Sequence, residues 1–182
     1  IEFPENDLDI VIMKSDGLPT YHFAHLVDDH LMRTTHITRG DEWVSSLPIH
    51  VQLFKVFGFN PPKYAHLSPI MKQEGDTKRK LSKRKDPEAA MSYYAELGIP
   101  TEAVHLYLMT IANTNFEQWY DQNKDKTLDD FKFDFKKISS SGALFDLEKL
   151  VNISRNYISY LKAEEVYEKV LEQAENFRKY AE

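Results

Sequence analysis

The segment THITRGDEWVSSLPIHVQLFKVFGFNPPKYAHL, residues 35–67, decides the fold because it reads as strand, helix and strand in succession. Residues 35–39 form a short β-branched run that breaks at Gly40. Two acidic residues follow and open a helix over residues 41–57, where negative charge suits the positive end of the helix dipole. Another short strand is predicted over residues 64–67.

The same alternation extends toward the start of the chain. Residues 8–13 are apolar and β-branched, which predicts a strand, and a turn over residues 14–17 follows it. Thr20 is then the N-cap of a further helix. Alternating strands and helices predict an α/β fold with a parallel sheet, in which ligands bind beyond the carboxyl ends of the strands. The segments at those ends are Gly17 to Tyr21, Arg39 to Trp43 and Pro69 to Lys85.

The pattern changes near residue 86, where helical spacing takes over. Helices are predicted over residues 87–97, 101–112, 127–135, 146–161 and 163–181. We therefore expect two domains: an α/β part over residues 1–86 and an all-α module over residues 87–182.

Composition excludes several classes of protein. The chain has 182 residues, with 23 Lys and Arg against 29 Asp and Glu, so a generally cationic nucleic-acid-binding coat is excluded although a local basic patch is not. It has no cysteine, which excludes a disulfide scaffold and a thiol nucleophile. No apolar run approaches the ~18 residues that cross a bilayer. Because the chain opens with Ile1, we expect a fragment that starts inside a larger protein.

The densest chemical signal is a basic run over residues 78–85, KRKLSKRK, which places six cations in eight positions of an acidic protein. One interpretation is a solvated basic loop. The alternative is a functional loop, because Leu81 and Ser82 interrupt the run and a flexible turn precedes it. Lys83 is a compact charge on a long stem, and such a lysine can neutralise charge that develops on a phosphate.

Lys80-Leu81-Ser82-Lys83-Arg84 resembles the Lys-Met-Ser-Lys-Ser loop of class I aminoacyl-tRNA synthetases, in the form typical of glutamyl-tRNA synthetases. Four further segments resemble that family in the same order: residues 14–22, 27–32, 39–43 with 48–50, and 141–150. The resemblance covers roughly residues 8–160. It implies the second half of a Rossmann-like parallel-sheet catalytic domain, followed by a helical stem-contact module that is truncated before an anticodon-binding region.

The resemblance implies that Tyr21 and Arg39 hold glutamate, and the chemistry agrees because an anionic amino acid needs a guanidinium and a hydroxyl donor. His25 stands where family members vary and is a further candidate for the same pocket. The alternatives are core packing for Tyr21 and an ion pair with Asp41 or Glu42 for Arg39.

Other roles also follow from the resemblance. Glu42 and Trp43 match residues near the ATP site, and the backbone of Ile70 and Met71 matches the segment that grips adenine, although Met71 could equally fill the core. The resemblance assigns catalysis to the loop residues: Lys80 and Lys83 would stabilise pyrophosphate while Ser82 shapes the loop. It also implies that this lysine-bearing hairpin is mobile and faces the pocket of Tyr21 and Arg39.

A cluster of histidines and aspartates suggests a metal site at first sight. Its members are His22, His25, Asp28, Asp29, His30 and His36. Their spacing matches no established zinc pattern, and we predict no protein-bound metal.

The implied parent is a cytoplasmic, monomeric glutamate–tRNA ligase that uses ATP with Mg²⁺ to charge tRNA(Glu) with L-glutamate. The family's His-Ile-Gly-His motif is absent from the 182 residues, so we expect this chain alone to be inactive. A fragment of a glutaminyl-tRNA synthetase and a non-catalytic tRNA-binding module are the alternatives.

Overall fold

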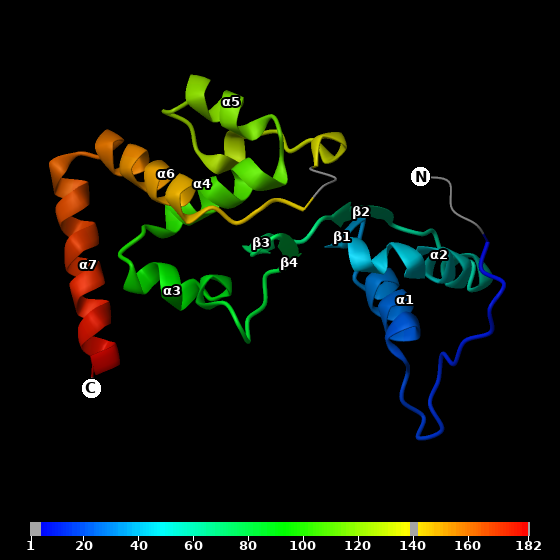
Figure 1. Ribbon diagram of the computed structural model, residues 1–182. Coiled ribbons are helices and arrows are strands. Elements are labelled where there is room, and N and C mark those ends of the chain that lie inside the picture. Colours follow the sequence, from blue (N-terminus) through cyan, green and yellow to red (C-terminus); the bar gives the residue numbers. More distant parts are fainter. Residues whose placement is uncertain (1–4, 139–141, 182) are drawn as a thin grey trace. The chain divides into compact units, whose positions relative to one another are not determined.

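The computed structural model describes residues 5–138 and 142–181, drawn as a coloured ribbon in Figure 1. The chain divides into two compact units, Ile1–Leu67 and Ser68–Glu182. The basic run over residues 78–85 therefore belongs to the second unit, whereas the domain boundary near residue 86 stays a prediction. Ser141, the first residue of one family-like segment, lies outside the described residues.

The first unit contains a parallel pair of strands and two helices. Its elements are α1 (Tyr21–Leu31), β1 (His36–Gly40), a 3₁₀ helix (Asp41–Ser46), α2 (Leu47–Val56) and β2 (Lys63–Leu67). β1 and β2 run parallel, with His36 opposite Lys63 and Gly40 opposite Leu67. The strand–helix–strand pattern and the parallel pairing predicted for residues 35–67 are thus confirmed.

Apolar side chains from the two helices and β1 form the core of this unit. Leu26 of α1 and Phe54 of α2 are almost completely buried, and Leu47 and Ile37 are buried with them. Burial of each such side chain contributes about 1.5–3 kcal/mol to folding. This core fixes α1 against α2, and both helices carry side chains of the candidate site.

The strand predicted over residues 8–13 is wrong. Met13 forms only an isolated bridge with Pro19, and Leu8 and Val11 are each 68% exposed. A strand needs a neighbouring strand to satisfy its backbone hydrogen bonds, and no described residue forms a β-ladder with residues 8–12, although the Ile12 carbonyl accepts the Thr20 N–H at 2.9 Å. The β-branched composition was therefore not sufficient.

The second unit combines a β-hairpin with helices. Its elements are β3 (Met71–Glu74), β4 (Thr77–Lys80), a 3₁₀ turn (Pro87–Ala89), α3 (Met91–Glu96), α4 (Thr101–Ala112), α5 (Phe116–Gln122), α6 (Leu147–Tyr160) and α7 (Ala163–Ala181). The hairpin turns at Gly75, whose positive φ of 59° suits a glycine at the first loop position. None of the described helices is long and apolar enough to cross a membrane.

The helix predicted over residues 127–135 is also wrong. That region contains two short 3₁₀ turns, Leu128–Asp130 and Phe135–Lys137, with extended backbone between them. The Asn113 side chain donates to the Asp134 carbonyl at 2.9 Å. Contacts of this kind with a distant part of the chain outweigh local helical preference.

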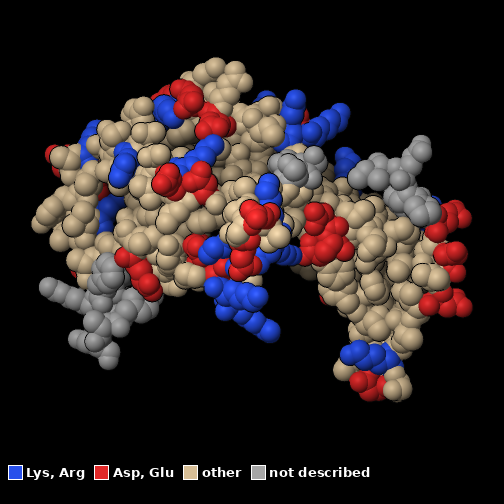
Figure 2. Space-filling model, viewed as in Figure 1, with Lys and Arg blue, Asp and Glu red and all other residues tan. Residues whose placement is uncertain are grey.

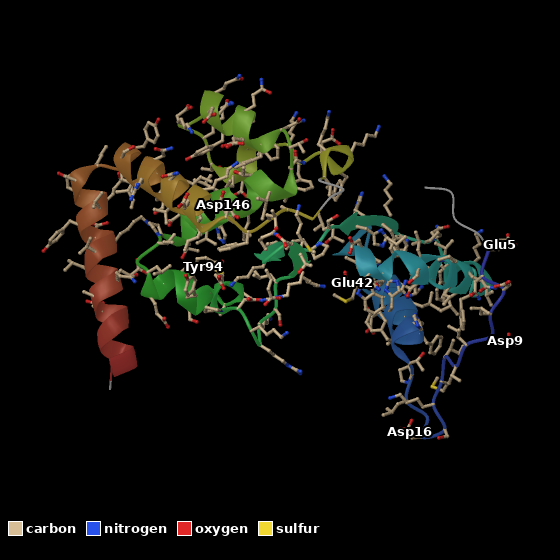
Figure 3. All side chains as sticks on the ribbon, in the orientation of Figure 1. Glu5, Asp9, Asp16, Glu42, Tyr94 and Asp146 are labelled. Atoms are coloured by element: carbon tan, nitrogen blue, oxygen red, sulfur yellow. The ribbon has the colours of Figure 1, made fainter. Side chains whose placement is uncertain are left out.

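The core of the second unit lies between α3, α4 and α6. Tyr94, Val104, Tyr107 and Leu150 are buried there, and the Tyr107 hydroxyl accepts the Asp146 N–H at 2.8 Å. Figure 3 labels Tyr94 and Asp146, which come from α3 and from the start of α6. The chain just before α6 also contacts the hairpin, because the Phe145 N–H donates to the Met71 carbonyl of β3 at 2.7 Å.

Candidate functional site

In the first unit, Arg39 lies against two aromatic rings. It is the last residue before Gly40 at the carboxyl end of β1, and its guanidinium carbon is 5.1 Å from the ring centroids of both Tyr21 and Trp43. Tyr21 begins α1 and Trp43 lies in the 3₁₀ helix that follows β1. Cation–π attraction and the short connection after β1 hold the guanidinium in place.

The polar contacts of Arg39 leave one donor unused. Its Nη2 lies 3.0 Å from Nδ1 of His25, whereas Nη1 is buried and has no hydrogen-bond partner among the described residues. An unpaired buried donor is costly, so the arrangement suits a bound anion such as a carboxylate.

His25 connects Arg39 to a hydrogen-bonding network beneath the rings. Its Nδ1 also contacts the Asp29 carboxylate, and its Nε2 lies 2.9 Å from the Tyr64 hydroxyl on β2. Burial, and then the nearby Arg39 charge, lower the pKa of His25. The imidazole is therefore held neutral between a cation and an anion.

His50 of α2 packs under the same cluster and was not anticipated from the sequence. It is 1% exposed, and its Nε2 lies 2.9 Å from Nδ1 of His22. Burial, followed by electrostatic interaction with His25 and Arg39, lowers the pKa of His50 to about 3. His50 is part of the family-like segment over residues 48–50, but the sequence of that segment does not show that the side chain is buried.

Two of the expected ATP-site residues lie close to Arg39 along the chain. Trp43 has its ring centroid 4.7 Å from that of Tyr21. Glu42, labelled in Figure 3, is exposed at the start of the 3₁₀ helix. The structure therefore brings Tyr21, Arg39 and Trp43 together with His25. Glu42 is the neighbour of Trp43 in the sequence.

In the second unit, the basic loop follows β4 and is shaped by the backbone of Ser82. The Ser82 carbonyl accepts the N–H groups of Lys85 and Asp86 at 3.1 and 2.8 Å, and its own N–H donates to the Asp86 carboxylate at 2.9 Å. Lys83 is exposed and makes no hydrogen bond or ion pair with any described residue. Figure 2 shows Lys and Arg side chains gathered where this loop lies.

Asp86 forms ion pairs with two cations of the hairpin, and the sequence analysis did not predict a role for it. Arg79 donates to both Asp86 oxygens at 2.6 and 2.8 Å, and Lys72 lies 3.1 Å from one of them. The hydrogen bonds that Arg79 donates hold the pKa of Asp86 well below its usual range, and the same bonds raise the pKa of Arg79. The sequence signal that could have pointed to Asp86 is its position directly after the basic run.

Ile70 and Met71 lead into β3, and much of their backbone is already hydrogen-bonded. The Ile70 carbonyl accepts the Leu81 N–H at 2.8 Å. Met71 donates its N–H to the Ala143 carbonyl at 2.8 Å and accepts the Phe145 N–H at 2.7 Å. A nucleotide contact made by Met71 would therefore have to come from its side chain.

Comparisons with known proteins now bear on these two groups of residues. Residues 1–172 match the family model described as tRNA synthetases class I (E and Q), catalytic domain. The chain belongs to this family. It is 57% identical over 168 residues to a glutamate–tRNA ligase of Clostridium perfringens and 53% identical over 174 residues to one of Acetivibrio thermocellus.

The class I synthetase match extends to solved structures. A crystal structure of glutamate–tRNA synthetase from Elizabethkingia anophelis superposes with a TM-score of 0.71 at 33% identity, covering 92% of this chain and 37% of that one. The two curated relatives are matched over 92% and 96% of this chain. The chain spans only 31% and 32% of their own lengths.

Proposed function

We propose that this chain is part of a glutamate–tRNA ligase, and that its first unit binds L-glutamate. The observation that carries the proposal is the buried, unpaired Nη1 of Arg39, held over the rings of Tyr21 and Trp43. A substrate carboxylate would satisfy this donor, and the hydroxyl of Tyr21, a residue that is 51% exposed, offers a second contact. His25 holds Nη2, so that Nη1 is left for the ligand.

The proposed reaction joins glutamate to ATP. An oxygen of the amino acid's α-carboxylate attacks the α-phosphorus in line, the bond to the bridging oxygen breaks, and pyrophosphate leaves with glutamyl adenylate as the other product. Lys80 and Lys83 would offset the charge on the leaving pyrophosphate, while Ser82 shapes their loop. Catalysis is then mainly positioning and charge stabilisation.

ATP would enter as its Mg²⁺ complex, with the ion held by phosphate oxygens and water. The described residues contain no group of three or more acidic or histidine side chains suited to a metal ion. Glu42 and Trp43 in the first unit, and Ile70 and Met71 in the second, are the residues that we propose to lie near ATP.

The second unit is proposed to contact the acceptor stem of tRNA(Glu) as a helical stem-contact module. Lysines in the segment after α5, among them Lys126, Lys132 and Lys136, supply positive charge for phosphate contacts. The glutamate would then be transferred to the 3′-terminal adenosine. We propose a monomeric cytoplasmic enzyme of translation.

An Arg39→Gln variant of the complete synthetase tests the glutamate site. Charge-assisted hydrogen bonds contribute about 1.5–3 kcal/mol, so the KM for glutamate in ATP–pyrophosphate exchange should rise about 10- to 100-fold. The matched control is Arg33→Gln, which changes an exposed arginine of the same unit. An unchanged KM in Arg39→Gln would refute the assignment.

A glutaminyl-tRNA synthetase is the second candidate, because the family model covers both specificities. Exchange measured with glutamate and with glutamine separates the two, and the Arg39 charge favours the anionic substrate. A non-catalytic tRNA-binding module is tested with Lys80→Ala and Lys83→Ala. A catalytic loop keeps tRNA affinity and loses turnover, whereas a binding patch loses affinity and shows a shallower salt dependence.

A further inference from the structure

We propose that Asp86 is the positioning residue that fixes the KLSKR turn, residues 80–84, and so sets where Lys83 projects. This inference rests on the proposed function of that turn. It concerns a residue outside the turn itself, on the connection between the hairpin and α3.

Asp86 is the most enclosed charged residue of the hairpin region. It is 3% exposed, yet its two oxygens receive donors from three segments of the chain. Arg79 on β4 donates to both oxygens, Lys72 on β3 contacts Oδ1, and the Ser82 N–H donates to Oδ2. A buried carboxylate with this many donors is fully satisfied and holds its neighbours in one arrangement.

The contact with Ser82 transmits this order to the turn. The Asp86 carboxylate accepts the Ser82 N–H, and the Ser82 carbonyl accepts the Asp86 N–H at 2.8 Å. The two residues thus close a small ring around Lys83, Arg84 and Lys85. Loss of the carboxylate would remove the hydrogen bond of the Ser82 N–H, and the turn would keep only the hydrogen bonds that the Ser82 carbonyl accepts.

Asp86 forms ion pairs with Arg79 of the basic run and with Lys72 of β3. Arg79 is paired with Asp86 and with Glu74, whose Oε2 it contacts at 2.7 Å. Lys72 is paired with Asp86 and Glu88. Lys83 has no such partner among the described residues and is exposed, so its charge is available to a phosphate. The fold therefore separates Arg79, which has a structural role, from exposed cations of the run such as Lys83, Arg84 and Lys85.

A fixed turn matters because a lysine that stabilises a leaving group must already be in place when charge develops. A loose turn would leave glutamate binding intact, since the proposed glutamate residues lie in the first unit. It would slow the chemical step instead. The expected signature is a loss in kcat with little change in the KM for glutamate.

The test uses the complete synthetase with Asp86→Asn, and with Arg79→Gln as a second variant should the first fail to fold. Trypsin cleavage after Lys83 reports how far the turn opens. Each rate is divided by that of a peptide covering residues 74–90 with the same substitution, which removes direct effects on the protease. Glu117→Gln is the matched control, because it breaks the exposed ion pair with Lys149.

Both variants should raise the normalised cleavage rate about tenfold or more and lower kcat for pyrophosphate exchange about tenfold, with the KM for glutamate within about twofold. The control should change neither. A turn that stays protected in both variants overturns the proposal, as does an open turn with unchanged kcat. If Lys83→Ala leaves kcat unchanged, the proposed role of the turn itself fails, which is a separate result.

Discussion

Protonation of the buried His50 should destabilise the first unit as the pH falls. Its imidazole is 1% exposed, and burial lowers its pKa to about 3 from an ordinary value of 6.5. The unfolded chain therefore binds a proton at a pH where the folded chain does not. Stability is complete above the unfolded pKa and is lost progressively as the pH falls from there toward about 3.

The size of the effect follows from this difference in proton binding. One proton taken up only by the unfolded chain changes the free energy of unfolding by about 1.4 kcal/mol per pH unit. Between the ordinary pKa and about pH 5, His50 alone should therefore remove about 2 kcal/mol. The lowered pKa of His25 acts in the same direction, so the measured slope should be at least this steep.

Urea unfolding at several pH values measures the slope. The chain has two tryptophans, and a Trp119→Phe background leaves Trp43 to report on the first unit. In that background, His50→Gln should reduce the loss of stability between about pH 7 and pH 5 by about 2 kcal/mol. His105→Gln is the control, because this exposed histidine lies in the second unit.

Equal slopes for His50→Gln and its parent would refute this reasoning. So would a free energy of unfolding that stays constant as the pH is lowered. The slope, and not the absolute stability of the variant, is the relevant quantity, because Gln does not fill the same space as an imidazole.

Three further predictions concern the second unit, each measured by urea unfolding with Trp119 fluorescence. Gly142→Ala should cost about 1–3 kcal/mol, because a Cβ there would lie 2.6 Å from the Met71 Cγ. Leu150→Ala should cost about 2–5 kcal/mol, because the side chain is completely buried. Tyr107→Phe should cost about 1 kcal/mol through loss of the hydroxyl that accepts the Asp146 N–H.

Matched changes check these values. Leu97→Ala removes the same atoms as Leu150→Ala from a side chain that is 50% exposed, so it should cost far less. Tyr167→Phe removes a hydroxyl from an exposed tyrosine of α7 and should be close to neutral. A Gly142→Ala variant as stable as its parent would contradict this prediction, because both the Met71 side chain and the Pro69 carbonyl would have to move at no cost.

Much of the local structure was predictable because it is encoded locally. Apolar spacing placed the helix over residues 101–112 at the bounds the structure shows, and glycine with flanking acids placed the break after β1. Apolar composition over residues 8–13 failed as a predictor because a strand depends on a partner, which composition does not supply. The helix predicted over residues 127–135 does not form, because the hydrogen bond from the Asn113 side chain to the Asp134 carbonyl overrides local preference.

The sequence by itself determined the family, through the ordered segments around Tyr21, Arg39 and the KLSKR turn, since each is a contiguous motif. Only the tertiary structure showed that Arg39 keeps a buried donor unpaired, that His50 lies beneath its neighbours, and that Asp86 takes Arg79 out of the basic run. The physical reason is that burial and ion pairing depend on which distant residues meet. That information is absent from any single stretch of the chain.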